Sequence, residues 1–160
     1  MKTNNLRIAW AAGFIDGEGC ISVQDCTARG ASRRQFQGFV DVAQTKPAPL
    51  DELVRLFGGR VRPYREDFYW RLYTADAARA VRQILPYLIG KRQQAELLLE
   101  FASLKGTQGR RRSDAVVARM TEICALFRVL NARRPRHAER LSERAPRIAI
   151  VESLPPRMMR

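Results

Sequence analysis

The sequence predicts an α+β domain in which helices cover one face of a four-stranded antiparallel sheet and leave the other face open. Two pairs of short segments carry apolar residues at every second position, the pattern of half-buried strands joined as hairpins. Helical patterns come before, between and after these pairs. The 160 residues suit one hydrophobic core. We therefore expect a single αββαββα domain over residues 1–160, with residues 131–160 as its basic, helical C-terminal extension.

The elements follow in order along the chain. Residues 5–17 are rich in Ala, Leu, Ile and Trp without proline, and they predict a first helix that ends at the Gly-rich sequence DGEG. Ser113 is suited to cap the last helix, whose apolar stripe runs to Leu130. The remaining helices are expected at residues 51–57, 76–85 and 91–104. The strands are expected at residues 20–23, 35–44, 60–62 and 68–74.

The charge of the chain points to a polyanionic partner. There are 29 Lys plus Arg against 16 Asp plus Glu, a net charge of +13, and 25 of the cations are Arg. Arg makes bidentate contacts to phosphates and to guanine edges, so this balance favours a nucleic acid. A coding bias in a GC-rich genome would also enrich Arg, and a merely basic protein, such as a ribosome-associated one, is the alternative.

Membrane and secretory classes do not fit the sequence. The longest apolar stretch, residues 8–15, is too short to span a bilayer, and no cleavable signal precedes it. Three cysteines without CxxC spacing indicate neither a disulfide framework nor a zinc site. We expect a soluble protein inside the cell.

The open sheet face is predicted to be rich in Arg and Gln. Its residues are expected to be Ser22, Gln24, Arg33, Gln35, Gln37, Asp41, Arg60, Arg62, Tyr69 and Arg71. Side chains of these kinds read base edges, Arg on guanine, Gln on adenine and Asp on cytosine, and a two-stranded ribbon fits the major groove. Any solvated sheet face is polar, but this one is short of acids, which favours a nucleic-acid surface.

The most specific feature is the sequence AAGFIDGEG at residues 11–19. It resembles the LAGLIDADG motif of the homing endonucleases, with Ala for the first Leu, Phe for the second Leu and Glu for the second Asp. The resemblance extends over nearly the whole chain and implies a saddle-shaped sheet that binds DNA. The motif occurs once, as in family members that act as homodimers. Independently, Ala9, Gly13 and Gly17 recur every four residues, and small side chains on one helix face allow close approach of a second helix.

The resemblance also implies the site residues. Glu18 matches the metal-binding carboxylate, and the backbone carbonyl at Gly17 matches a second metal contact. Gln44 matches a residue that orders water, with base reading as the alternative role. Lys91 matches a residue that assists near the scissile phosphate, with an ordinary solvated lysine as the alternative. Asp16 is expected to be structural.

The same resemblance implies cofactors and further DNA contacts. The cofactor is expected to be Mg²⁺, with Mn²⁺ able to substitute and Ca²⁺ supporting binding without cleavage. Arg133, Arg134 and Arg136 follow the last helix, where related homodimers touch the DNA backbone. The single histidine, His137, argues against nuclease families that use a histidine base.

These features together predict a site-specific homing endonuclease. It would cut both strands of a pseudo-palindromic target of roughly 20 base pairs, by metal-dependent phosphodiester hydrolysis, and so promote intron or intein mobility. The partners are double-stranded DNA and a second copy of the chain, with no membrane and no small-molecule substrate. It would act where the host DNA is, in a bacterial or phage-infected cytoplasm or an organelle. The alternatives are an RNA-splicing maturase and a catalytically silent DNA-binding regulator; keeping Glu18 argues against the regulator.

Overall fold

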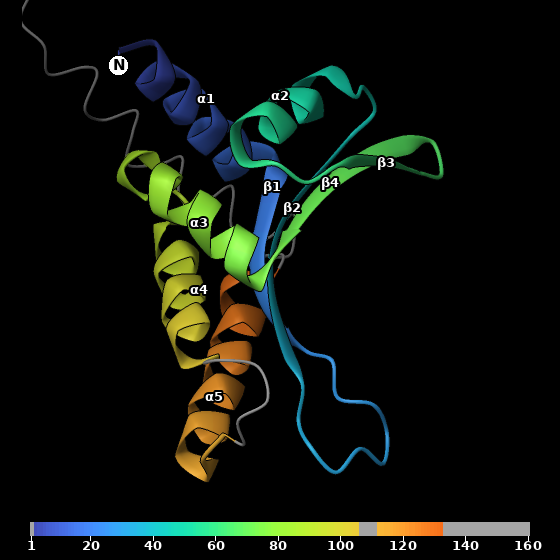
Figure 1. Ribbon diagram of the computed structural model, residues 1–160, viewed down its shortest axis with the longest axis vertical. Helices are drawn as coiled ribbons and strands as arrows, with labels where there is room; N and C mark the ends of the chain where they lie inside the picture. Colours follow the sequence, from blue (N-terminus) through green and yellow to red (C-terminus); the bar gives the residue numbers. More distant parts are fainter. Residues whose placement is uncertain (1, 106–111, 133–160) are drawn as a thin grey trace, which may run out of the picture.

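The computed structural model describes residues 2–105 and 112–132 and confirms the α+β prediction (Figure 1). Its helices are α1 (Lys2–Glu18), α2 (Ala48–Phe57), α3 (Thr74–Ile84), α4 (Arg92–Leu104) and α5 (Asp114–Leu130), with a short 3₁₀ turn η1 (Leu85–Tyr87). Its strands are β1 (Gly19–Asp25), β2 (Phe36–Gln44), β3 (Val61–Tyr64) and β4 (Asp67–Tyr73). Most of the predicted extension at 131–160 lies outside the described residues.

The four strands form one antiparallel sheet in the order β1-β2-β4-β3. The two hairpins β1–β2 and β3–β4 meet along the central pair β2–β4, which runs from Phe39 opposite Tyr73 to Gln44 opposite Phe68. Figure 1 shows the two hairpin ends pointing away from this shared centre, the β1–β2 loop at the bottom and the β3–β4 turn at the upper right. The two hairpins therefore form two-stranded ribbons that extend in different directions from the central pair β2–β4.

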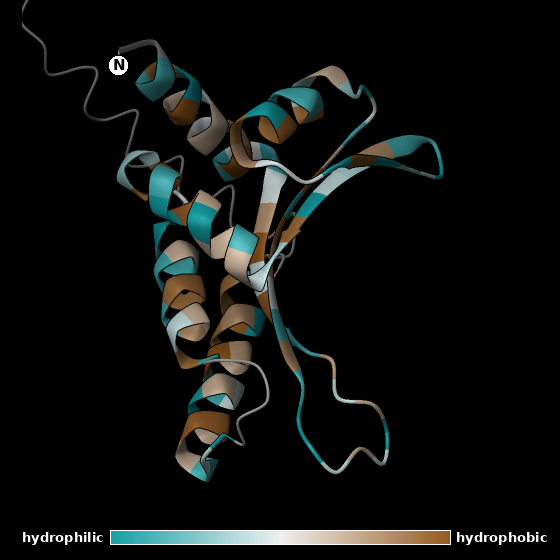
Figure 2. Ribbon diagram, in the orientation of Figure 1, coloured by the Kyte–Doolittle hydropathy of each residue, from teal (hydrophilic) through white to brown (hydrophobic). Residues whose placement is uncertain are grey.

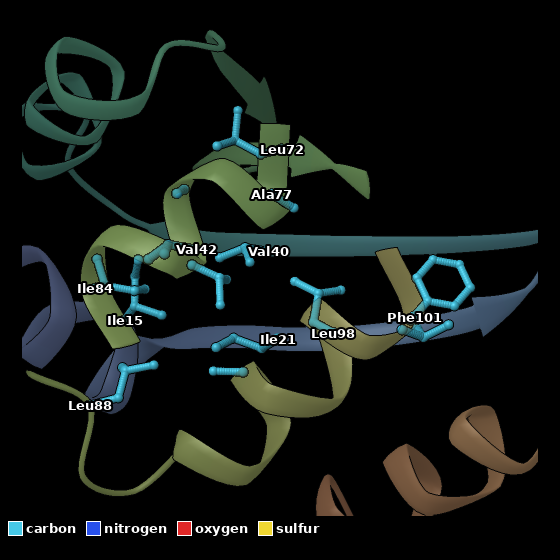
Figure 3. Close-up of a cluster of buried hydrophobic side chains, with 14 of the residues drawn as sticks. Ile15, Ile21, Val40, Val42, Leu72, Ala77, Ile84, Leu88, Leu98 and Phe101 are labelled. Carbon is cyan, nitrogen blue, oxygen red and sulfur yellow. The ribbon is translucent and has the colours of Figure 1, made fainter. Parts of the chain in front are cut away.

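Helices cover only one face of this sheet, as Figure 1 shows for α1, α3, α4 and α5. Buried and exposed positions alternate along β2, where Val40 and Val42 are buried and their neighbours are not. Apolar and polar residues lie on separate faces most clearly in α2 and α3 (Figure 2). The buried faces of the helices and the covered sheet face form one core, which includes Ile15, Ile21 and Leu98 (Figure 3).

The sequence DGEG, predicted to end the first helix, lies at the helix–strand junction. Helix α1 continues through Asp16 and Gly17 to Glu18, and β1 begins at the next residue. A side chain at Gly19 would bring a Cβ to 2.8 Å from the carbonyl oxygen of Ile15, closer than real Cβ atoms approach. Glycine is therefore required at this junction so that the strand can leave the helix without a loop.

Several helix ends differ from the prediction by one to three residues. Helix α2 was expected from residue 51, but it begins at Ala48 and contains Pro49 in its first turn, where proline is tolerated. Helix α3 begins at Thr74, directly after β4. Ser113 caps α5 as predicted, because its side chain accepts a hydrogen bond from the backbone N–H of Val116. No helix among the described residues is long and apolar enough to span a membrane.

The close packing of α4 on β2 gives a test of the fold. A Cβ at Gly38 would lie 2.7 Å from Leu98 Cδ1 and 3.1 Å from the ring of Phe101, and both of these side chains are fully buried. Gly38→Ala should therefore lower the free energy of unfolding by about 1–3 kcal/mol, as overpacking does. Urea unfolding measures this loss.

Gly90→Ala is the matched control, because a Cβ there would meet its nearest neighbour, Asp16, at an ordinary 3.7 Å. It should unfold like the wild type. If Gly38→Ala is as stable as Gly90→Ala, then α4 does not pack on β2 as described.

Candidate nucleic-acid interface and cleavage site

Glu18 and Gln44 are neighbours at the ends of two elements. Glu18 ends α1 and Gln44 ends β2, and the pairing of Gly19 with Val42 brings these two ends together. The Gln44 Nε2 donates to the Glu18 Oε2 at 3.4 Å. Glu18 is exposed, so its carboxylate remains open to a ligand. Two of the three predicted catalytic residues are therefore neighbours.

Asp16 joins the end of α1 to the turn before α4. Its Oδ2 accepts from the backbone N–H groups of Ile89 at 2.7 Å and Gly90 at 2.9 Å, and its Oδ1 accepts from that of Lys91 at 2.8 Å. Burial raises the pKa of Asp16, but these three hydrogen bonds and the charge of Lys91 outweigh it, so the pKa lies below its ordinary value. Asp16 is thus an ionised clamp, consistent with the structural role expected for it.

The clamp also places Lys91 beside the end of α1. The Lys91 Nζ donates to the backbone carbonyl of Asp16, two residues before Glu18. Lys91 is only partly exposed and has a defined partner, unlike the freely solvated lysine considered as the alternative. The structure therefore brings Glu18, Gln44 and Lys91 to the same end of one helix.

The donors near Glu18 fit a hard divalent cation. A carboxylate and a helix-end backbone carbonyl, as at Gly17, offer the oxygen ligands that Mg²⁺ prefers. Within residues 2–105 and 112–132, no group of three or more His, Cys, Asp or Glu side chains could hold a metal. Glu18 is the candidate carboxylate of this site, and Mg²⁺ commonly completes its shell with water and substrate phosphates.

The open face is the sheet face opposite the helices, and the strand register orders its residues in rows. From the Glu18 end towards the β1–β2 loop, the rows are Ala43-Tyr69-Arg62, Cys20-Asp41-Arg71, Ser22-Phe39-Tyr73 and Gln24-Gln37. Seven of the ten predicted residues lie on these rows. The other three flank the strands: Arg33 and Gln35 lie in the exposed β1–β2 loop and Arg60 directly precedes β3.

The predicted set includes Tyr69 but leaves out two other aromatic residues of this face, Phe39 and Tyr73. Phe39 and Tyr73 share a row, and the Arg71 guanidinium lies over the Phe39 ring, 4.9 Å from its centroid. The alternation of Phe39 with buried Val40 was the signal that places its ring on the open face.

Two predicted base-reading residues are bonded to each other. The Nε of Arg71 donates to Asp41 Oδ2 at 3.0 Å, and the Nη2 of Arg71 donates to the same oxygen. Burial lowers the pKa of Arg71, but the hydrogen bonds to Asp41 and Tyr73 and the charges of these two residues together outweigh it, so the pKa lies above its ordinary value. Asp41 and Arg71 therefore form an ion pair on the open face.

The base of the β1–β2 loop is fixed by a second network that the sequence did not predict. Hydrogen bonds from the side chain and backbone of Thr27, together with Arg34, lower the pKa of Asp25 to about 2. The Arg34 Nη1 also donates to Thr121 Oγ1 on α5 at 2.8 Å. The loop is thereby tied to the helical layer at its root.

The outer face of α1 is partly apolar and open. Gly13 and Gly17 are exposed, and a Cβ at either would meet nothing within 4 Å; Ala9 is half-buried. Leu6 and Trp10, on the same helix, are 71% and 41% exposed. The core instead takes the other face of α1, including Ile8 and Ile15, so this helix has a second apolar face. Arg133, Arg134 and Arg136 lie outside the described residues.

Comparisons with known proteins identify the fold. No family model matches the sequence, and no curated protein matches it. Among solved structures, the homing endonuclease I-CvuI, in complex with its DNA target in the presence of Ca²⁺, has a TM-score of 0.74 at 20% identity over 97% of this chain and 100% of that one. The archaeal intron-encoded homing endonuclease I-Vdi141I, complexed with DNA, has a TM-score of 0.70 at 15% identity over 92% and 98%.

A further neighbour, I-SmaMI bound to uncleaved DNA in the presence of Ca²⁺, matches 88% of this chain but only 48% of its own length, with a TM-score of 0.61 at 20% identity. These neighbours are DNA endonucleases, and the chain has the fold of the LAGLIDADG homing endonucleases. It matches I-CvuI and I-Vdi141I over nearly their full lengths, as expected of the single-motif type.

The Asp16 clamp predicts a pH-dependent stability. Asp16→Asn should lower the free energy of unfolding by about 1–3 kcal/mol at neutral pH, because the amide has one uncharged acceptor oxygen in place of two carboxylate oxygens, and its NH₂ group cannot accept from a backbone N–H. Since the folded-state pKa lies below the ordinary value, this stabilisation is present above the ordinary pKa and is lost as the pH falls through the lowered one. Urea unfolding at fixed protein concentration should separate wild type and variant at pH 7, and the difference should shrink as the pH falls through the lowered pKa of Asp16.

Glu66→Gln, in the exposed β3–β4 turn, makes the same change of charge and should leave unfolding unaltered at both pH values. Equal stability of wild type and Asp16→Asn at pH 7 would contradict the clamp.

Proposed function

We propose that this chain is a homodimeric, Mg²⁺-dependent, site-specific DNA endonuclease that makes a double-strand break in a long pseudo-palindromic target. The observation that carries the proposal is the meeting of Gln44 and Lys91 at the end of the helix that presents Glu18. This end adjoins the first rows of an Arg- and Gln-rich open face. A candidate cleavage centre and a candidate DNA-reading surface are thus continuous.

The open face supplies the DNA contacts in this proposal. Its two hairpins would follow the major groove on either side of the cleavage centre, with polar side chains towards base edges. Arg62 lies in the first row and Gln24 in the last, and both are exposed, so side chains of this face could contact successive base pairs along the duplex. The chain's net charge of +13 supports attraction to the DNA backbone, and Arg133, Arg134 and Arg136 are proposed to contact phosphates.

A second copy of the chain completes the site. The exposed surface around Gly13 and Gly17 on α1 would pack against the same surface of the partner about a two-fold axis. Because Glu18 follows Gly17 in sequence, this pairing would bring the two Glu18 carboxylates near the axis. Each strand of the target would then have a carboxylate beside its scissile phosphate.

The chemistry follows from the residues at this centre. A divalent cation, when bound, supplies Lewis-acid stabilisation of phosphodiester charge and a more acidic water. Glu18 would hold the cation, with the Gly17 carbonyl as a second oxygen ligand. Gln44 already donates to Glu18, so its amide is placed to orient that carboxylate or a nearby water. Lys91 would offset negative charge that develops on the phosphate, with Asp16 keeping its turn in place.

The biological role proposed is homing. A break at a rare site of roughly 20 base pairs promotes copying of a mobile intron or intein into that site, in whichever DNA-containing compartment the host gene lies. We propose that Mn²⁺ substitutes for Mg²⁺ and that Ca²⁺ supports binding without cleavage. A silent regulator on the same fold would have no use for an exposed Glu18 contacted by Gln44.

The role of Glu18 is testable by a near-isosteric change. The substrate for this test is the host DNA without the inserted gene, in which the two flanking sequences are joined directly. In Mg²⁺, Glu18→Gln should reduce cleavage of this DNA by at least about 100-fold, because the amide is a poor ligand for the cation. Specific binding in Ca²⁺ should be largely kept, as measured by gel shift beside gel-based cleavage. A chelator should act on the wild type as the substitution does.

Glu66→Gln is the control for cleavage, since Glu66 lies in the exposed β3–β4 turn. A Glu18→Gln variant that cuts at near the wild-type rate refutes the metal role. Wild type that never cuts but restores splicing of its host transcript identifies a maturase instead.

The dimer surface is testable at Gly13. Gly13→Leu should convert the wild-type dimer into a monomer in sedimentation velocity, because the bulky side chain would keep the two helices apart. The variant should remain folded, since a Cβ there meets nothing within 4 Å in its own chain and Leu favours helix.

Ala118→Leu adds the same bulk at an exposed position of α5 and should leave the dimer intact. An unchanged dimer in Gly13→Leu would place the interface elsewhere.

A further inference from the structure

Arg71 is held on three sides at the middle of the open face. Its Nε and Nη2 both donate to Asp41 on the neighbouring strand. Its guanidinium lies 4.9 Å from the centroid of the Phe39 ring and 5.9 Å from that of Tyr69. These rings lie in the rows on either side of Arg71, so the guanidinium is confined along the strand as well as across it.

The two hydrogen bonds to Asp41 occupy one edge of the guanidinium, and Tyr73, which also raises the pKa of Arg71, lies beside it on the open face. A guanidinium has five N–H donors in a rigid planar fork. Asp41 takes two of them, on the Nε side, which leaves three, two on Nη1 and one on Nη2. One N–H from each terminal nitrogen points the same way, as a parallel pair. The Arg71 side chain is 34% exposed, so it reaches the surface of the open face.

A parallel pair of N–H donors matches one base. Guanine presents two adjacent acceptors, O6 and N7, in the major groove, and a bidentate arginine is the commonest specific contact to it. A fixed guanidinium loses less rotamer freedom on binding than a flexible one. We infer that Asp41 is a positioning residue that acts through Arg71, and that the Asp41–Arg71 ion pair selects a G·C pair in each half of the target. This inference rests on the proposed function.

The register places that base pair within the half-site. The Cys20-Asp41-Arg71 row is one residue along β1 from Gly19, which follows Glu18 directly. The Gln24-Gln37 row and the β1–β2 loop lie farther from Glu18. The selected G·C pair therefore belongs to the inner part of each half-site, towards the cleavage centre.

Two other roles for Asp41 make different predictions. If Asp41 accepts a hydrogen bond from a cytosine amino group by itself, then Asp41 and Arg71 specify different base pairs. If the pair only stabilises the sheet, then loss of either residue weakens the fold without changing base preference. Base preference measured position by position separates these roles from the inferred one.

The experiment is selection of bound duplexes from a library randomised over 24 base pairs, in Ca²⁺ to prevent cleavage. The wild type should yield a two-fold symmetric consensus with a G·C pair in the inner half-site. Arg71→Ala should reduce the preference for that pair by about 5- to 150-fold, the range of a bidentate contact. Arg71→Lys should lose it similarly although it keeps the charge, because an ammonium has no planar fork.

Asp41→Ala should weaken the preference for the same base pair by about 2- to 12-fold, because it frees one long side chain that must be ordered again on binding. The double variant should lose no more preference than Arg71→Ala alone, since Asp41 acts only through Arg71. Asp51→Ala removes an exposed carboxylate from α2 and should leave the consensus unchanged. Thermal melting of each variant reports any loss of the fold.

The outcomes are distinct. The inference is overturned if Asp41→Ala and Arg71→Ala weaken the base preference at different positions, or if their losses of preference add in the double variant. Either result leaves the proposed function intact. An unchanged consensus in folded Arg71→Lys also overturns the inference. Failure of the wild type to select any consensus removes the proposed function, and this inference with it.

Discussion

The arrangement of the whole molecule depends on the Asp16 carboxylate and the three backbone N–H groups that it accepts. These donors come from residues 73 to 75 positions later in the chain, so the contact joins the end of α1 to the start of α4. Gly19 lets β1 leave the same helix end at once, because no side chain fits against Ile15 there. Glu18 lies between these two fixed points and is the residue that remains open. A rigid framework around an exposed carboxylate is what a ligand site requires.

The spacing of apolar residues and the residues typical of turns and helix caps were sufficient to predict the helices and strands of the fold. The hairpin alternation around Val40 and the cap at Ser113 are local patterns, and the structure has both. The glycines of DGEG mark the end of the first helix, and α1 ends within this sequence, at Glu18, one residue beyond the predicted end. What the local pattern does not predict is that Asp16 in this last turn contacts the backbone before α4. Such contacts depend on residues far away in sequence.

The candidate site was predictable only through the motif. Composition indicates a basic protein but does not locate a site in it. Glu18, Gln44 and Lys91 are far apart in sequence, and only the fold brings Gln44 and Lys91 to the end of α1. The two apolar faces of α1 show the limit of periodicity: it cannot tell which face the core takes, and Leu6 and Trp10 proved to be outside. Likewise, the open face was predicted residue by residue, but the bond between Asp41 and Arg71 depends on strand register. Structures at 15–20% identity share this fold although no family model matches the sequence.

The three glycines of α1 and its junction differ in what requires them. Gly19 is required by its own chain, as the approach to Ile15 shows. Gly13 and Gly17 are not, because a Cβ at either would meet open space. Each costs a helix about 1 kcal/mol relative to Ala, so the isolated chain would be more stable without them. A partner backbone packed closely against α1 would supply the missing reason for glycine, and the exposed Leu6 and Trp10 on the same helix would be buried with it. In the proposed dimer, the exposed surface of α1 around Gly13 and Gly17 and the Glu18 carboxylate would lie next to each other at the end of the same helix, so one pairing of the helices would form the interface and bring the two carboxylates together.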